Sequence, residues 1–313
     1  MTDFPPITIL LAVYNGGPHL SQQLDSIAAQ DRGDWRLLVS DDGSSDGSQA
    51  ICAAFRARHG AERVRLIDGP GAGATRNFLH LIAAAPDGAA LAFSDQDDVW
   101  LPQKMTRAVA HLTGRSGPVH YCARTLICDE NLRGRTPSRR FTRPHGFRNA
   151  LVQACTPGNS SVFNPAAAAL LKHSVGAALR RGIEAHDWWA YQVVSGAGGE
   201  VVFDPEPALL YRQHTANVMG RNDTASGRLR RMTLLIGGDY GAWLAANADA
   251  LGEIEDLLTP VNRALLAGFA RMLRLSGPAA LKQVRRLGLY RQTNGGDAAL
   301  AMAAAAGLLR RRS

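Results

Sequence analysis

The 313-residue chain lacks any apolar run near the roughly 18 residues that a membrane-spanning helix needs. Its first residues, Met1-Thr2-Asp3-Phe4-Pro5-Pro6, also lack the basic start and apolar stretch of a signal peptide. From these two absences we expect a cytoplasmic protein.

Cysteine is scarce and scattered. The chain has four, with no C-x-x-C pair and no nearby histidine partners: Cys52, Cys122, Cys128 and Cys155. This spacing argues against a zinc site and against a disulfide framework. We expect four reduced, buried thiols.

Acidic residues are outnumbered, 27 against 35 basic ones, and the excess of +8 is uneven. Residues 221–313 hold 14 Arg or Lys and 7 Asp or Glu, so this region carries +7. No acidic residue lies between Arg263 and Arg291. Because no nucleic-acid-binding motif accompanies this block, we expect no nucleic-acid partner and favour an anionic membrane surface.

Five apolar residues are expected to form the membrane-facing side of these helices: Leu265, Leu266, Phe269, Met272 and Leu273. A solvated helix face and contacts between copies in a homo-oligomer are the alternatives for the same block.

The chain does contain a series of short apolar runs, each followed by a polar loop and a helical pattern. The first four runs cover residues 7–13, 35–39, 64–67 and 89–93. Runs without polar alternation are typical of strands buried on both faces, so we predict an α/β fold with a mostly parallel sheet flanked by helices.

The pattern then becomes mixed up to about residue 212. Four strands and two helices are predicted there: strands 119–124, 160–163, 200–203 and 208–211, and helices 165–173 and 187–194. The basic, turn-rich stretch 133–148 is predicted to be a mobile loop. Beyond Gly220 we predict helices broken near Pro260, Pro278 and Gly295-Gly296.

Polar residues follow three of the first four strands, at Tyr14-Asn15-Gly16-Gly17, Asp41-Asp42 and Asp95-Gln96-Asp97-Asp98. Ligands of open α/β sheets lie outside the carboxyl ends of the strands, so we expect these residues at one rim. Three carboxylates in four residues suit a hard divalent cation, Mn²⁺ or Mg²⁺, and the phosphates it carries. A solvated acidic turn, or a cap of the next helix, is the alternative.

Five motifs, in this order, resemble the family two inverting glycosyltransferases, most closely the bacterial rhamnosyltransferase-like branch. They are Ala12-Val13-Tyr14-Asn15-Gly16, Ser40-Asp41-Asp42-Gly43-Ser44, Asn77-Phe78, Ser94-Asp95-Gln96-Asp97-Asp98-Val99-Trp100 and His186-Asp187-Trp188-Trp189. The resemblance implies the GT-A fold and a sugar-nucleotide donor.

The resemblance covers about residues 5 to 220 and suggests how the chain is divided. A glycosyltransferase domain would span 1–220, with a nucleotide-binding part at about 1–115 and an acceptor-side part at about 116–220. Residues 221–313 would form a basic helical C-terminal region.

The resemblance also assigns residues to the donor. Tyr14 would offer its ring to the base and Asn15 its backbone, while Asp41 or Asp42 would accept from a pyrimidine N3–H. Asp95 would hydrogen-bond the ribose, and Arg76 would approach the nucleotide from the third loop. The alternatives are an ordinary Asx turn for Asp41-Asp42 and a surface arginine for Arg76.

For metal and acceptor, the resemblance makes Asp97 the ligand of the cation that bridges the two phosphates. His214 would be a further metal or diphosphate ligand. Asp187 would be the base that deprotonates the acceptor hydroxyl. A helix cap remains the alternative for Asp187, and a structural role remains the alternative for His214.

Three further assignments stay open. The family's usual motif before Asp187 is Glu-Asp, so His186 departs from it, and it would modulate Asp187, bind acceptor or pack. Asp98 would tune the metal site or cap the next helix. The stretch Thr156-Pro157-Gly158-Asn159-Ser160-Ser161 is a candidate acceptor loop or a plain loop.

The resulting prediction is a metal-dependent inverting glycosyltransferase that moves a sugar, rhamnose being the first candidate, onto a surface glycan or lipid-linked saccharide. One rival is a sugar nucleotidyltransferase, which is expected to carry a basic phosphate loop that Tyr14-Asn15-Gly16-Gly17-Pro18-His19 lacks. The other is a non-catalytic sugar-nucleotide-binding component of a glycan assembly complex.

Overall fold

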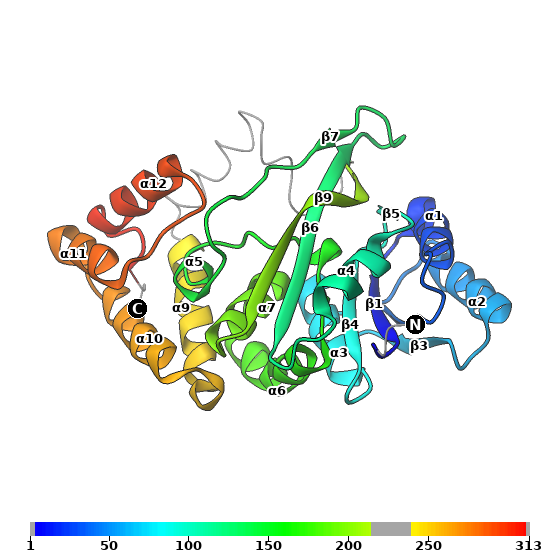
Figure 1. Cartoon of the computed structure of the whole chain (residues 1–313), viewed down its shortest axis with the longest axis horizontal. Coiled ribbons are helices and arrows are strands. Elements are labelled where there is room, and N and C mark those ends of the chain that lie inside the picture. Colours follow the sequence, from blue (N-terminus) through cyan, green and yellow to red (C-terminus); the bar gives the residue numbers. More distant parts are fainter. Residues whose placement is uncertain (1–3, 214–238, 311–313) are drawn as a thin grey trace.

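A computed structural model describes residues 4–213 and 239–310, and its first part is a parallel βα repeat (Figure 1). In chain order this repeat consists of β1 (Ile7–Val13), α1 (Gly17–Ala28), β2 (Arg36–Asp41), α2 (Ser48–His59), β3 (Val64–Asp68), α3 (Ala74–Ala84) and β4 (Ala90–Ser94). The strands lie in the order β3-β2-β1-β4, and each neighbouring pair is parallel. The predicted strands of this part are confirmed to within two residues.

The other half of the sheet mixes strand directions. Its elements are β5 (Val99–Trp100), α4 (Lys104–Leu112), β6 (Val119–Cys128), β7 (Thr136–Pro137), α5 (Phe147–Ala150), the 3₁₀ turn η1 (Gly158–Ser160), β8 (Val162–Phe163), α6 (Pro165–Arg181), α7 (His186–Gly196) and β9 (Glu200–Arg212). Strand β8 is antiparallel to β4 and to β6, whereas β9 is parallel to β6 and antiparallel to β5. The described residues thus form one α/β sheet of nine strands.

Strand β9 corrects one prediction. A single strand runs from Glu200 to Arg212, where two short strands around Pro205 and Pro207 were expected. Its register against β6 shifts, because Asp204 pairs with Ala123 while Pro207 pairs with Arg124. Such a bulge accommodates prolines, which cannot donate a ladder hydrogen bond.

The sheet separates two apolar cores. On β1, Ile7, Ile9, Leu11 and Val13 pack with α1, α2 and α4, while Leu10 packs with α3, α6 and α7 on the opposite face. Successive side chains of a strand point to opposite faces, so both faces of β1 are buried. This burial explains why the strand carries no polar alternation.

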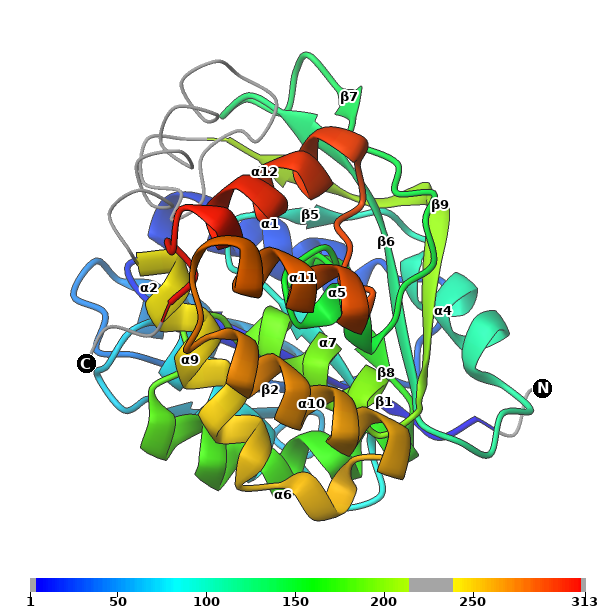
Figure 2. The ribbon, with the colours of Figure 1, turned by 90° about the vertical axis from the view of Figure 1, so that its left-hand side faces the viewer.

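The chain is described again from residue 239, as four helices and a 3₁₀ turn. They are α9 (Asp239–Gly252), η2 (Glu255–Leu257), α10 (Pro260–Met272), α11 (Gly277–Leu287) and α12 (Asn294–Ala305). Pro260, Pro278 and Gly295-Gly296 lie in first turns, so the predicted breaks are helix starts. Figure 2 shows these helices as a layer over α5, α6 and α7.

The apolar side chains of this layer are buried, which overturns the predicted membrane-facing side. The five residues concerned are at most 7% exposed and belong to the core shared with α3, α6 and α7: Leu265, Leu266, Phe269, Met272 and Leu273. The basic side chains of the block are the exposed ones: Arg271, Arg274, Lys282, Arg285 and Arg286. Within residues 4–213 and 239–310, no helix is both long enough and apolar enough to cross a membrane.

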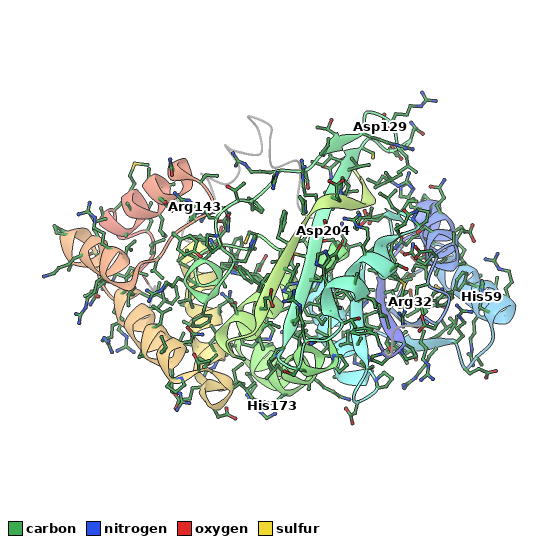
Figure 3. All side chains as sticks on the ribbon, in the orientation of Figure 1. Arg32, His59, Asp129, Arg143, His173 and Asp204 are labelled. Atoms are coloured by element: carbon green, nitrogen blue, oxygen red, sulfur yellow. The ribbon has the colours of Figure 1, made fainter. Side chains whose placement is uncertain are left out.

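The end of the basic stretch predicted to be mobile is fastened to the C-terminal helices. Arg143, labelled in Figure 3, donates to Asp297 Oδ2 at 2.5 Å, to the Arg291 carbonyl at 2.6 Å and to Asn294 Oδ1 at 2.6 Å. Asn149 Nδ2 donates to the Tyr290 carbonyl at 3.0 Å. These bonds hold the segment around α5 between α7 and α12.

All four cysteines are buried and free, as predicted. Burial raises the pKa of the Cys52 and Cys155 thiols to about 12. Thiols with such a pKa stay protonated at neutral pH and behave as small apolar groups.

Candidate functional site

The polar residues at the strand ends meet at one edge of the sheet. The register places Val13 beside Asp41 across β1 and β2, and Leu11 beside Ser94 across β1 and β4. Because these strands are parallel, the segments that follow them leave the sheet at the same edge. The rim expected from the sequence is therefore present.

The first two loops of this rim hold each other in place. Asn15 donates its backbone N–H to Ser44 Oγ at 2.9 Å, and its Oδ1 accepts the Ser45 N–H at 2.9 Å. Gly17 donates its N–H to Asp46 Oδ2 at 2.8 Å. Asn15 takes a left-handed φ of 48°, which asparagine tolerates better than most residues. The loop leaves the Tyr14 side chain 58% exposed at the rim.

Gln96, in the middle of the acidic segment, ties the first and fourth strand ends together. Its Oε1 accepts the Tyr14 N–H at 2.8 Å, and its Nε2 donates to the Tyr14 carbonyl at 2.9 Å. A Cβ at Gly16 would lie 2.5 Å from Gln96 Oε1, so any larger residue there would displace the Gln96 amide. The sequence reasoning assigned no role to Gln96, and no local pattern marks a contact across 82 positions.

Asp41 and Asp42 are both engaged by loop groups, in different ways. Asp42 is 7% exposed, and its two oxygens accept the backbone N–H groups of Gly71 at 2.8 Å and Gly73 at 2.7 Å. Asp41 is half-buried and accepts from Gln49 Nε2 at 2.7 Å and from the N–H and hydroxyl of Ser44. Asp42 thus shapes the β3–α3 loop, while Asp41 stays closer to the surface of the rim.

Arg76 lies in the first turn of α3, close to that loop. Its side chain is exposed, and no hydrogen bond or ion pair joins it to the part of the chain that the structure describes. Next to it, Thr75 Oγ1 donates to the Glu184 carbonyl at 2.7 Å. This bond brings the start of α3 to the segment that leads into α7 and Asp187.

The carboxylates after β4 are crowded, and Asp187 is close enough to join them electrostatically. Burial raises the pKa of Asp95 to about 7, and the charges of Asp97 and Asp187 add to the rise. Asp98 is fully buried, and burial, Asp97 and Asp95 raise its pKa well above the ordinary value. Carboxylates from the segment after β4 and from the first turn of α7 therefore lie close enough to interact.

Asp98 is bonded into a buried polar network. Its Oδ2 accepts from Asn159 Nδ2 at 2.7 Å, and the Asn159 carbonyl accepts from Lys104 Nζ at 2.6 Å. Burial lowers the pKa of Lys104 well below its usual value, although Asp98 and Asp95 oppose this shift. The Lys104 nitrogen also lies 3.2 Å from the ring centroid of Trp100, which is buried packing as predicted.

Asp187 opens α7 and packs against the candidate acceptor loop. Its Oδ1 accepts the Trp188 N–H at 2.7 Å, and a Cβ at Gly158 would lie 3.1 Å from Asp187 Cβ. His186 stacks on Phe78 with ring centroids 3.8 Å apart, and burial lowers its pKa to about 4. His186 is therefore a neutral, packed ring at pH 7, and its Nε2 has no partner among the described residues.

The chain was compared with known proteins. The model of a family described as Glycosyl transferase family 2 matches residues 8–176, which is more than half of the chain. The chain belongs to glycosyltransferase family 2. Its resemblance to the rhamnosyltransferase-like branch also holds.

Two relatives and one solved structure illustrate the similarity. The dTDP-rhamnosyl transferase RfbG of Shigella flexneri is 25% identical over 249 residues, which cover 78% of this chain and 85% of RfbG. WfgD of Escherichia coli, named UDP-Glc:alpha-D-GlcNAc-diphosphoundecaprenol beta-1,3-glucosyltransferase, is 26% identical over 156 residues, or 49% of this chain and 57% of WfgD. The crystal structure of S. aureus TarS 1-349 matches 90% of each chain with a TM-score of 0.51 at 12% identity. At this identity the match shows the fold alone, which is of the GT-A type.

For this family 2 glycosyltransferase, the described residues hold no group of three or more His, Cys, Asp or Glu side chains arranged to bind a metal. His214 lies outside the described residues. Mg²⁺ and related ions are commonly held by one or two carboxylates plus substrate phosphates and waters, so Asp97 with Asp95 has suitable donor chemistry. Burial raises the pKa of Asp95 most, and the repulsion from Asp97 and Asp187 that adds to this rise is of the kind that a bound cation relieves.

Lys104 is the second residue of this glycosyltransferase's site that the sequence reasoning missed. It heads the buried stripe of α4 that continues through Met105, Ala108, Val109 and Leu112. A lysine at a core position of a predicted helix was the available signal, because a buried amine needs a partner.

Proposed function

We propose that this chain is a metal-dependent inverting glycosyltransferase that moves rhamnose from a deoxythymidine diphosphate carrier to a saccharide of a bacterial surface glycan. Similarity to RfbG over most of both chains supports the donor, and the name of WfgD supports a lipid-linked acceptor. The observation that carries the proposal is that Asp187 is close enough to Asp95, 92 residues earlier in the chain, for its charge to help raise the pKa of Asp95. This proximity supports a candidate base beside a candidate phosphate site.

The proposed donor pocket lies in the nucleotide-binding part, at about 1–115. The exposed ring of Tyr14 stacks on the base, the backbone at Asn15 contacts it, and Asp41 accepts from its N3–H. Asp42 acts through the β3–α3 loop whose N–H groups it holds, and Arg76 reaches the phosphates from the next turn. Asp95 hydrogen-bonds the ribose.

Asp97 would hold the cation, with Asp95 beside it and His214 as a further ligand. A bound Mn²⁺ or Mg²⁺ would neutralise the negative charge that builds on the nucleoside diphosphate as it leaves. The chain itself supplies the carboxylates, and the adjacent Asp98 is fully buried.

In the acceptor-side part, at about 116–220, Asp187 takes the proton from the acceptor hydroxyl as that oxygen attacks the anomeric carbon. Asp187 Oδ1 is occupied by the Trp188 N–H, which leaves Oδ2 as the basic oxygen. The 156–161 loop, packed on Asp187 at Gly158, forms the wall on which the acceptor lies.

Asp187→Asn tests the central assignment. We expect sugar transfer to fall at least 100-fold, because general bases contribute about 10²–10⁴, while calorimetric affinity for dTDP with Mn²⁺ stays within twofold. Glu184→Gln, an exposed carboxylate three residues earlier, is the matched control and should keep full activity. Transfer by Asp187→Asn at the wild-type rate would exclude this residue as the base. Donor binding without transfer by the wild type would instead favour a non-catalytic component.

A thermal-shift panel of nucleotide sugars with and without Mn²⁺ tests the donor. Ligand binding raises apparent stability according to its affinity, so dTDP-rhamnose with Mn²⁺ should give the largest shift. A larger shift with a uridine or guanosine donor would overturn the choice of thymine as the nucleobase. Equal shifts with and without Mn²⁺ would overturn the proposed metal dependence of donor binding.

We also propose that the C-terminal region, 221–313, holds the enzyme at the inner face of the plasma membrane, in the cytoplasm. The exposed side chains around Arg285 and Arg286 can attract anionic lipid, while the apolar residues beneath them are in the core. Binding to anionic vesicles should weaken with salt and with Arg285→Glu plus Arg286→Glu. The control is Arg56→Glu plus Arg65→Glu, at the opposite end of the molecule. If both double variants lose vesicle binding equally, the effect is one of net charge and not of the C-terminal region.

A further inference from the structure

A lysine is buried directly behind the acidic loop. Lys104 is 0% exposed, and its Nζ donates to the Asn159 carbonyl at 2.6 Å while lying 3.2 Å from the centroid of the Trp100 ring. Lysine is rarely buried completely, because an amine that leaves water must find partners in the protein. The hydrogen bond therefore joins α4 to the η1 turn, and the ring contact packs the amine against β5.

Asn159 extends this connection to the acidic segment. Its Nδ2 donates to Asp98 Oδ2 at 2.7 Å, and Asn159 and Asp98 are both buried. The backbone of Asn159 thus bonds to Lys104 and its side chain bonds to Asp98. We call these three residues the buried brace.

The two ends of the buried brace lie at the two halves of the proposed site. Asp98 directly follows the candidate metal ligand Asp97. Gly158 directly precedes Asn159, and a Cβ at Gly158 would lie 3.1 Å from Asp187 Cβ and 3.6 Å from Asp187 Cγ. A shift of the η1 turn would therefore move the surface on which Asp187 packs.

We propose that Lys104, Asn159 and Asp98 are positioning residues that set the spacing between the donor carboxylates and the loop beside Asp187. The proposal rests on the proposed function, since the spacing matters only if donor and acceptor meet there. Transfer between two substrates depends on alignment, and a displacement of about 1 Å can cost up to about 100-fold in rate. Donor binding involves only the segment after β4, at the Asp98 end of the buried brace. The affinity for the donor is therefore less sensitive to this spacing than kcat is.

Lys104→Met and Asn159→Ala test the buried brace one bond at a time. Methionine keeps the length and packing of lysine but cannot donate to the Asn159 carbonyl, whereas alanine at 159 keeps that carbonyl and removes only the bond to Asp98. Lys172→Met is the matched control, because Lys172 Nζ also donates to a backbone carbonyl, that of Ala85 at 2.7 Å, but from α6. We expect kcat for transfer to fall at least tenfold in each brace variant, with dTDP–Mn²⁺ affinity within twofold of wild type and no change in the control.

The double variant separates positioning from general stability. If the three residues act as one unit, the double variant should lose no more kcat than the worse single variant, since the first substitution already frees the loop. Multiplied losses, a kcat within twofold of wild type, or a parallel fall in dTDP–Mn²⁺ affinity would each overturn the proposal. A wild type that transfers no sugar would overturn the proposed function and this proposal with it, whereas an active wild type with brace variants of equal kcat would overturn the positioning role alone.

Discussion

The buried carboxylate of Asp42 offers a quantitative test of how the rim is built. Asp42 accepts the N–H groups of Gly71 and Gly73 with both oxygens, and these two glycines have left-handed φ values of 63° and 88°. In Asp42→Asn, one oxygen becomes an NH₂ group that faces a backbone N–H. The variant therefore loses one charge-assisted bond and leaves donors without an acceptor.

The expected cost follows from these bonds. A hydrogen bond to a charged group contributes about 1.5–3 kcal/mol, and an unsatisfied buried donor costs about 1–3 kcal/mol, so we expect a total of about 2.5–6 kcal/mol. In a chain of this size, 1 kcal/mol corresponds to about 2 °C, which gives a fall in Tm of about 5–12 °C. Affinity for dTDP should fall only a few-fold, as a consequence of the loosened loop.

Thermal unfolding by circular dichroism and calorimetric titration with dTDP measure the two effects. Asp68→Asn, at the exposed end of β3, is the matched control and should change neither. An unchanged Tm with dTDP affinity lowered tenfold or more would refute the reasoning. Asp42 would then contact the nucleotide itself, as the sequence alone allowed.

Three further predictions concern the acceptor loop, acid stability and the metal. Gly158→Ala places a Cβ 3.1 Å from Asp187 Cβ and 3.2 Å from His186 Nε2. Steady-state kinetics should therefore show kcat lowered about tenfold, with little change in Tm. An unaltered kcat would mean that the loop moves without affecting Asp187. Burial lowers the pKa of His145 to about 4, below the unfolded value of about 6.5, so the unfolded chain binds a proton that the native one does not, and stability falls as the pH drops from 6.5 towards 4. His145→Phe keeps the stacking on Phe203 but removes the titrating group. The free energy of unfolding, measured with urea, should therefore differ between pH 7 and pH 5 by about 2 kcal/mol less in the variant than in the wild type. The same difference in wild type and variant would contradict the burial of a neutral imidazole. Because the pKa of Asp95 is raised to about 7, Mn²⁺ must displace a proton at low pH, and calorimetry should find it bound about tenfold more weakly at pH 6 than at pH 8; equal affinities would place Asp95 away from the cation.

The parallel half of the fold was predictable because its signals are local. Each run such as residues 7–13 is apolar throughout and ends in polar residues, and the structure has β1 at Ile7–Val13. Strand β9 was not predictable in the same way, because Pro205 and Pro207 normally end a strand and only the partner β6 allows the bulge. The direction of the apolar face of α10 likewise depends on α9 and α11, which pack against it and which no local pattern identifies.

In the site, the sequence indicated which residues lie close together but not which contacts each of them makes. Asp41 and Asp42 look alike in the chain, yet one is held by Ser44 and Gln49 and the other by the loop after β3. The part of Asp98 was open between the metal and a helix cap, and its bond to Asn159 comes from 61 positions away. Such distant contacts are decided by packing, which a single sequence does not display.

The core shared by the C-terminal helices has a practical consequence for engineering. Leu244 and Phe269 pack in the same cluster as Leu171 and Trp188, and Arg143 fastens the segment around α5 to α12. Cutting the chain after β9 would uncover this cluster, so a truncated protein should aggregate. A chimera that carries the C-terminal helices of a relative would also need that relative's facing sides of α5, α6 and α7. Replacing α7 would also replace Asp187, the residue proposed as the base. In this protein, the proposed membrane-binding region and the proposed acceptor side therefore cannot be exchanged independently of each other.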